Sequence, residues 1–197
     1  MRKSEETRKY IIERVAPVFN MHGYEGTSMS QLTQAINMTK GAIYGNFKDK
    51  DEIAIEAFRY NVAQLSDKIN GVIAVKENAC DKLIAFANFY LDEFATISGN
   101  GGCPILNAAI DSDHVHQDLK SEVIRAFENF MNGIASIVYS GIKKKAINRN
   151  VKPEQFASVF VSLIEGGLGL SKVTGNTIHL SRNIDHNIHL VNAELRL

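Results

Sequence analysis

The sequence predicts an all-α fold, with a small helical head at the N-terminus and a larger helical body after it. Apolar residues recur at intervals of three and four along the chain, as they do on one face of a helix. No stretch alternates apolar with polar residues in the manner of a half-buried strand. A strong breaker, Ser-Gly-Asn-Gly-Gly at 98–102, interrupts the pattern. We therefore predict a head at residues 1–50 and a body at residues 51–197.

The composition is that of an ordinary globular protein. The chain has 197 residues, of which 45% are hydrophobic and 22% charged, and this excludes a disordered chain. No apolar run follows the basic residues of the start, and the two cysteines, Cys80 and Cys103, are far apart. We expect a reduced, cytoplasmic protein with no secretion signal and no disulfide framework. The most apolar stretch, 156–170, is expected to be too short to span a membrane.

Charge is unevenly distributed between the predicted head and body. The 22 basic and 22 acidic side chains of the whole chain cancel. Residues 1–50 hold eight basic and five acidic side chains, a net charge of +3, which leaves −3 for the remainder. A basic head fits a polyanionic partner. It fits equally well a solvated surface that binds nothing.

Start and stop signals place the helices of the head. Ser28, with a glutamine three residues later, forms a capping box that begins a short helix. Asn37 tolerates the left-handed backbone of a tight turn, and Thr39 is a good N-cap for a second short helix. Asp49, with a glutamate three residues later, opens a long helix that leads into the body. The helices expected beyond it cover about 79–97, 104–110, 115–145, 153–175 and 177–195.

Residues 28–47 have the order of a helix-turn-helix: a short helix, a tight turn and a second short helix. The second helix can enter a major groove only if its outer face is polar and its start is unobstructed. Ile43 and Phe47 would hold it to the core, and the outer positions are polar or glycine. A structural hairpin with a solvated surface is the alternative. The predicted DNA-binding residues are Thr27, Ser28, Thr39, Lys40, Gly41, Tyr44, Asn46 and Lys48.

Two motifs of the head resemble those of a known family. Segment 23–29, Gly-Tyr-Glu-Gly-Thr-Ser-Met, and segment 38–53, Met-Thr-Lys-Gly-Ala-Ile-Tyr-Gly-Asn-Phe-Lys-Asp-Lys-Asp-Glu-Ile, are closely similar to the DNA-binding domain of the tetracycline-repressor (TetR) family. The similarity covers residues 8–55 or so, and both residue types and spacing agree. Asn46 stands where the family usually has His, so the departure concerns one DNA contact rather than the fold.

The resemblance implies an all-helical, homodimeric transcriptional repressor. In the family the body binds a small-molecule effector, which shifts the protein toward a conformation that no longer fits its operator. The last two long helices of each subunit form the dimer interface, and here they would be 153–172 and 177–195. The residues support this, since Gly166, Gly167 and Gly169 allow close backbone approach at a cost of roughly 1 kcal/mol each in helix propensity. The same helices could instead form the core of a monomer.

The effector pocket is predicted from aromatic and polar residues of the body. Asn107 and Glu165 are polar groups within apolar helical runs, so one or both could orient a polar group of the ligand. Each could equally lie on an exposed face or make an ordinary interhelical hydrogen bond, and an aromatic stripe can be plain core. The predicted ligand-binding residues are Phe58, Phe86, Tyr90, Phe94, Asn107, Phe127, Phe130, Met131 and Glu165.

We expect no enzymatic activity, cofactor or metal site. The sequence has no paired catalytic carboxylates and no nucleophile elbow. The spacing of His186 and His189, and the Asp/His cluster at 111–116, would permit metal ligation. Helix capping and ordinary surface histidines explain both groups more simply. The alternative to a DNA-binding regulator is a helical small-molecule-binding protein that does not bind DNA.

Overall fold

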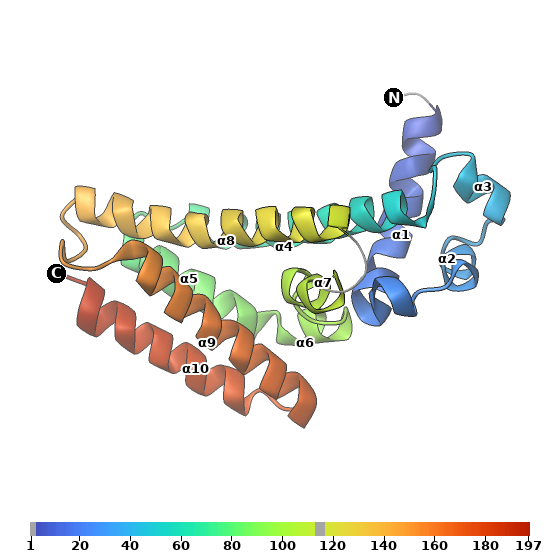
Figure 1. The fold of residues 1–197 in the computed structure, drawn as a ribbon. Helices are drawn as coiled ribbons and strands as arrows, with labels where there is room; N and C mark the ends of the chain where they lie inside the picture. Colours follow the sequence, from blue (N-terminus) through green and yellow to red (C-terminus); the bar gives the residue numbers. More distant parts are fainter. Residues whose placement is uncertain (1–2, 113–116) are drawn as a thin grey trace. The chain divides into compact units, whose positions relative to one another are not determined.

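The computed structural model describes residues 3–112 and 117–197. Within these ranges the regular elements are helices and no β-strand is present, which confirms the predicted all-α class (Figure 1). The elements are α1 (Lys3–Gly26), α2 (Met29–Ile36), α3 (Lys40–Tyr44), α4 (Lys50–Ala74), α5 (Ala79–Asp92), α6 (Phe94–Gly99), α7 (Pro104–Ser112), α8 (Gln117–Lys143), α9 (Pro153–Thr174), α10 (Ile178–Leu190) and the π-helix η1 (Val191–Leu195).

Most helix boundaries follow the sequence signals. The helix predicted over 177–195 changes to the π-helix η1 at Val191, and two other predicted helices are interrupted or shortened. α2 and α3 begin directly after Ser28 and Thr39, as predicted. The single helix predicted over 79–97 is instead two helices, because the chain leaves helical geometry at Glu93 (φ −95°, ψ 10°). The helix predicted to reach residue 145 ends at Lys143, and Lys145 adopts a left-handed backbone with φ 56°. Neither break falls at a glycine or a proline, on which breaker signals depend.

Packing divides the chain into two compact units. The first unit contains residues 1–65 together with 100–126, and the second contains 66–99 together with 127–197. α7 and the start of α8 are thus packed in the same unit as the head helices, although they follow the head by many residues in the sequence. The functional boundary at residue 50 remains a prediction.

Two apolar clusters form the core of the first unit. In one of them, Phe58 of α4 packs with Leu119 and Val123 of α8. The other joins α1, α2, α3 and the start of α4, and it includes Ile43 and Phe47, the two residues predicted to hold α3 to the core. Its buried members are Ile11, Ile12, Val15, Ala16, Phe19, Leu32, Ile36, Ile43, Phe47, Ile53, Ala54 and Ala57.

Polar bonds attach α7 to the C-terminal part of α1 within the first unit. The Asn107 amide donates hydrogen bonds to the carbonyl oxygens of Gly101 (2.8 Å) and Asn20 (3.2 Å). Gly101 has φ +99°, and a Cβ there would lie 2.5 Å from the Asn20 carbonyl oxygen, so only glycine lets this loop approach α1 so closely. The Asp111 carboxylate accepts a hydrogen bond from the backbone N–H of Tyr24.

In the second unit, α9 and α10 form a tightly packed helical pair. Ser171 Oγ accepts a hydrogen bond from the N–H of Leu180 (2.8 Å), and Asn183 Nδ2 donates to the carbonyl oxygen of Leu163 (2.8 Å). A Cβ on Gly167 would lie 2.9 Å from the Cα of Leu180. The polar bonds fix the register of the two helices, and the glycine permits their close contact.

α9 is longer than the apolar stretch 156–170, which was expected to be too short to span a membrane. The helix extends beyond this stretch at both ends and has 22 residues, and among the described helices it alone is long and apolar enough to cross a membrane. Of its most apolar window, 44% is buried inside the structure. A core helix of a soluble protein passes the same test, so length and composition decide nothing here.

Candidate nucleic-acid interface

The turn between α2 and α3 has the local geometry that the sequence predicts. Ser28 Oγ accepts a hydrogen bond from the N–H of Gln31, and Gln31 Oε1 accepts one from the N–H of Ser28, which completes the capping box. Asn37 is left-handed (φ 53°, ψ 43°). Thr39 Oγ1 accepts a hydrogen bond from the N–H of Ala42 (3.3 Å). Local side-chain bonds thus set the start of both short helices.

α3 has one buried face and one exposed face. Ile43 is fully buried, and Phe47 just beyond the helix is nearly so. Thr39, Lys40 and Gly41 at the N-terminal end are exposed. Because the short helix is held from one side only, its opposite side and its N-terminal end are open to a partner. This is the arrangement that insertion into a major groove requires.

Among the other predicted contact residues, some lie at the surface and some are used within the protein. Ser28 is exposed, the Tyr44 side chain is half-exposed, and the Lys48 side chain is 87% exposed. Thr27 is fully buried and its hydroxyl donates to the carbonyl oxygen of Gly23 (2.6 Å). Asn46 is partly buried, and its Nδ2 donates to the carbonyl oxygen of Ala42 (2.8 Å). A DNA contact by Thr27 or Asn46 stays a prediction.

The glycine-aromatic motif joins α1 to the start of α4. The Tyr24 hydroxyl donates a hydrogen bond to the Asp51 carboxylate. Lys50 Nζ donates to the carbonyl oxygen of Tyr24 (2.6 Å) and lies 4.4 Å from the centre of its ring. Burial and the neighbouring Asp51 carboxylate raise the pKa of Tyr24 far above its usual value, so its hydroxyl remains a donor. The motif therefore fixes where α4 leaves the head.

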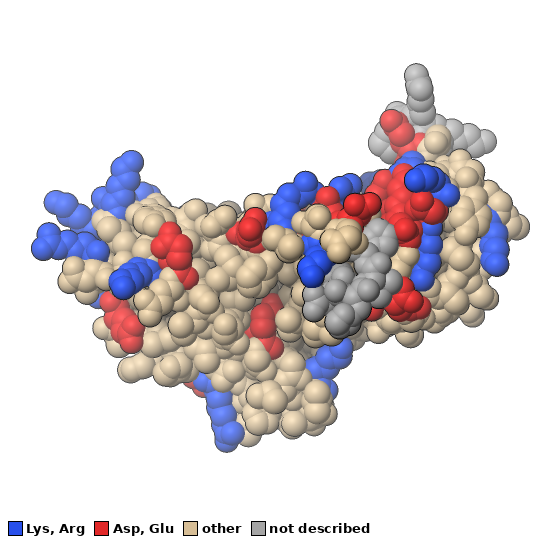
Figure 2. Space-filling view, viewed as in Figure 1, with Lys and Arg blue, Asp and Glu red and all other residues tan. Residues whose placement is uncertain are grey.

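Exposed positive charge is not confined to the head. Figure 2 shows Lys and Arg side chains gathered at the loop between α8 and α9, in the second unit. The segment 143–152 contains no acidic residue. Averaging the charge over the body hides this basic loop, so net charge per predicted domain is a poor guide to where cations are concentrated. The exposed cations of the loop are Lys143, Lys144, Lys145, Arg149 and Lys152.

The residues predicted to bind an effector are divided between the two units. Phe58 and Asn107 belong to the first unit. Phe58 is part of a buried apolar cluster, and the Asn107 amide makes the interhelical bonds to α1 described above. The interhelical alternative for Asn107 is therefore what the structure contains. The members in the second unit are Phe86, Tyr90, Phe94, Phe127, Phe130, Met131 and Glu165.

Three of these residues come together in an aromatic cluster of the second unit. The Phe86 ring centre lies 5.5 Å from that of Phe130 and 5.8 Å from that of Tyr90. Phe160 of α9, which is not among the residues predicted to bind an effector, joins them at 5.7 Å from Phe86. Phe127 is 49% exposed and is not part of the described ring contacts. The cluster thus joins α5, α8 and α9 through contacts between aromatic rings.

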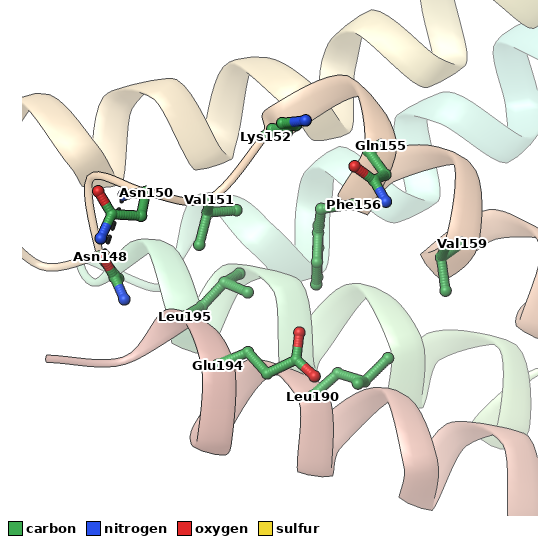
Figure 3. Close-up of a pocket in the computed structure, with 10 residues that line it drawn as sticks. All are labelled: Asn148, Asn150, Val151, Lys152, Gln155, Phe156, Val159, Leu190, Glu194 and Leu195. Atoms are coloured by element: carbon green, nitrogen blue, oxygen red, sulfur yellow. Dashed lines mark hydrogen bonds between the residues drawn. The ribbon is translucent and has the colours of Figure 1, made fainter.

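A surface groove of about 490 Å³ lies elsewhere in the second unit (Figure 3). Phe156 and Val159 extend from α9 toward the facing side chains of Leu190 and Glu194 (Figure 3). The groove contains none of the residues predicted to bind an effector. Its lining residues are Asn148, Asn150, Val151, Lys152, Gln155, Phe156, Val159, Leu190, Glu194 and Leu195.

The weaker metal candidates gain no support. The rings of His186 and His189 stack with centroids 6.3 Å apart. Among the described residues no group of three or more His, Cys, Asp or Glu side chains is arranged to hold a metal ion. Asp113, His114 and His116 lie outside the described residues.

A helix-turn-helix with an exposed polar recognition helix, at the start of an all-helical chain, defines a DNA-binding regulator. Residues 11–57 match the family model described as "Bacterial regulatory proteins, tetR family". Residues 79–187, more than half of the chain, match "Tetracyclin repressor-like, C-terminal domain". The chain therefore belongs to the tetracycline-repressor (TetR) family of transcriptional regulators.

Individual relatives agree with this assignment over most of their length. The HTH-type transcriptional repressor DhaR of Mycobacterium sp. (strain GP1) is 21% identical over 169 residues, 86% of this chain and 84% of DhaR. A TetR-family regulator from Cytophaga hutchinsonii is 31% identical with a TM-score of 0.93, covering 99% of this chain and 98% of that one. FadR from Bacillus subtilis, solved with stearoyl-CoA, has a TM-score of 0.73 and 18% identity, covering 94% and 97%.

Proposed function

We propose that this protein is a homodimeric, cytoplasmic repressor that leaves its operator when a small molecule binds in the body. The observation that carries the proposal is the division of α3 into a buried face, held by Ile43 and Phe47, and an exposed polar face. A palindromic operator matches the twofold symmetry of a dimer, with one α3 in each half-site.

The exposed residues fall into three proposed roles. Ser28, Tyr44 and Lys48 contact phosphates, which positions the protein without reading sequence. Lys40, in the first turn of α3, donates to the edge of a base, guanine being the base whose acceptors suit a lysine best. Gly41 is exposed and has no side chain, so it lets the helix approach the groove closely.

The outer face of α9 supports a second copy of this chain as the partner. Four apolar residues and one glycine recur there at intervals of four and three: Val159, Leu163, Gly166, Leu170 and Val173. The valines and Leu170 are exposed, Val173 to 86%, and a Cβ on Gly166 would meet nothing within 4 Å.

Read from Gly166 outward, this stripe is nearly the same in both directions, with leucine and then valine on either side. A C2 interface places a surface against a copy of itself, so residues on one side of the axis meet residues on the other. The stripe meets that requirement if the two α9 helices of a dimer lie antiparallel, with the twofold axis near Gly166. Val159 also lines the groove of Figure 3, so the second copy would extend over part of that groove.

The aromatic cluster of the second unit is the proposed effector-binding region. The rings of Phe86, Tyr90 and Phe130 suit an apolar or aromatic molecule. FadR, which shares the fold, binds an acyl-CoA. An effector acts only if it binds the DNA-incompatible conformation more tightly than the DNA-bound one, since equal affinity for both would shift no population.

Selection of operator DNA from a random duplex library tests the proposed function. The purified protein should enrich an inverted repeat, and its affinity for that repeat should fall steeply with salt, because each phosphate contact releases counterions. Light scattering of the free protein should give the mass of a dimer. Failure to enrich any sequence, together with binding that is insensitive to salt, would contradict the proposal.

A further inference from the structure

We propose that Arg8 is a positioning residue for DNA recognition, which acts by clasping the C-terminal end of α3 to α1 and α4. The clasp consists of Arg8, Glu52 and Glu56 together with the backbone that follows α3. The inference rests on the proposed function, because positioning of α3 matters only if α3 reads DNA. The proposal gives Arg8 a role in DNA recognition without requiring its side chain to touch DNA.

The Arg8 guanidinium is held from several directions at once. Its Nη2 donates to Glu52 Oε1 (2.8 Å) and to Glu56 Oε1, and its Nη1 donates to the carbonyl oxygen of Asn46. The guanidinium carbon lies 4.2 Å from the centre of the Phe47 ring. One side chain of α1 thus contacts both the end of α3 and two residues of α4.

A second set of bonds completes the connection from the α4 side. Glu52 Oε2 accepts a hydrogen bond from the backbone N–H of Lys48 (2.7 Å), while its other oxygen accepts from Arg8. Asn46 Nδ2 donates to the carbonyl oxygen of Ala42 inside α3. The backbone from Asn46 to Lys48 is therefore bonded to α1, to α4 and to α3 itself.

α3 needs such support because it is short. It has five residues, and Ile43 is its one buried side chain. A helix of this length has no stability of its own and takes its orientation from its neighbours. Thr39 fixes the N-terminal end through its cap, and the clasp fixes the C-terminal end. With only one of these in place, the helix could rotate about Ile43, and Lys40 would lose its alignment with a base edge.

The contacts require arginine rather than any cation. The planar guanidinium can lie flat on the Phe47 ring while the N–H groups of its rigid fork donate to three oxygens, and the compact ammonium of lysine has no such flat fork. The side chains of Arg8, Glu52 and Glu56 are 29%, 35% and 31% exposed, so the group is partly shielded from solvent. By contrast, Arg14 on the same helix is exposed and contacts only the ring of Tyr10 among the described contacts.

A charge-neutral pair of double variants tests the proposal. Arg8→Gln/Glu56→Gln breaks the clasp and removes one positive and one negative charge. Arg14→Gln/Glu13→Gln removes the same charges from exposed positions on α1 and serves as the matched control. Each is titrated by fluorescence anisotropy with the operator selected by the wild type and with a random duplex, over a series of salt concentrations.

The clasp variant should bind the selected operator about tenfold or more weakly, as expected when one base contact is misaligned, with an unchanged salt slope. Its affinity for the random duplex, and both affinities of the control, should stay within about twofold of wild type. If the clasp variant prefers the selected operator over the random duplex as strongly as the wild type does, the proposal is overturned. Equal losses on both duplexes with a shallower salt slope would overturn it as well, since Arg8 would then be a direct phosphate contact. If the wild type selects no operator, the proposed function fails instead.

Arg8→Lys keeps the charge and provides a second test should the double variant fail to fold. Amide hydrogen exchange should accelerate within residues 43–48, because the bond to Asn46 and the stacking on Phe47 are lost, and remain unchanged in α5, which lies in the other unit. Unchanged protection over 43–48 would overturn the proposal.

Discussion

Replacing Gly167 with alanine tests how closely α9 and α10 are packed. A Cβ at this position would lie 2.9 Å from the Cα of Leu180 and 3.1 Å from Asn183 Nδ2. Carbon atoms in favourable contact are about 3.5–4.0 Å apart, so α10 would have to move away by about half an ångström. The Cα of Leu180 is backbone, and it cannot move aside without moving the helix.

The expected loss of stability follows from three contributions. Overpacking of this kind costs about 1–3 kcal/mol. Displacement of Asn183 weakens its hydrogen bond to the Leu163 carbonyl, which contributes about 1 kcal/mol. Alanine recovers about 1 kcal/mol over glycine in helix propensity. The net change is a destabilisation of about 1–3 kcal/mol, which for a chain of this size lowers Tm by about 3–9 °C.

Thermal melting followed by circular dichroism at one fixed protein concentration measures this change, since dimerisation would make Tm depend on concentration. Gly133→Ala in α8 is the matched control, because a Cβ there meets nothing within 4 Å. It should raise Tm by about 2–4 °C through helix propensity alone. A Gly167→Ala protein that melts at or above the wild type would refute the close packing of α9 on α10.

Four other substitutions have defined outcomes. Val159→Lys places a charge on the outer stripe of α9. It should raise the dimer dissociation constant, measured by analytical ultracentrifugation, by about a hundredfold or more with unchanged helicity. A dimer that persists in this variant would show that the interface lies elsewhere. Lys48→Ala should weaken binding to the selected and random duplexes equally and reduce the slope of log affinity against log salt concentration by about 0.9. Lys40→Ala should instead change the base preference. An unaltered preference would show that Lys40 does not read a base. Hydrogen bonds from the Lys48 N–H and from Arg8 hold the pKa of Glu52 below its usual value. The ionised Glu52 carboxylate therefore stabilises the folded protein fully at any pH above the usual pKa of a glutamate. This stabilisation is lost as the pH falls through the lower pKa that Glu52 has in the folded protein. Glu52→Gln should therefore flatten the acid limb of a urea-stability profile measured from neutral pH downward, and an unchanged limb would contradict this assignment.

The sequence predicts the recognition element well because its signals are local. The capping box at Ser28, the left-handed turn at Asn37 and the cap at Thr39 each depend on residues within four positions of one another. The buried side of α3 follows in the same way from the spacing of Ile43 and Phe47. Such features need no knowledge of what packs against the segment.

Contacts between distant residues could not be predicted in this way. Arg8 and Glu56 are separated by 48 positions, and Asn107 and Asn20 by 87. Nothing in the spacing of either pair indicates that they meet. The same limit applies to Asn107, since a polar residue in an apolar run fits a ligand contact and an interhelical bond equally well. Only the position of α1 beside α7 shows that the interhelical bond forms.

The packing of α7 with the head connects several elements of the first unit to α1. The boundaries between the two units fall inside α4 and α8, so each of these continuous helices belongs to both units. Several polar bonds also join α7 and the start of α4 to α1 within the first unit. There, Asn107 and Asp111 of α7 and Lys50 of α4 are bonded to the end of α1. Within the first unit, α7 and the start of α4 are thus bonded to α1, and the Arg8 clasp connects α1 to the end of α3.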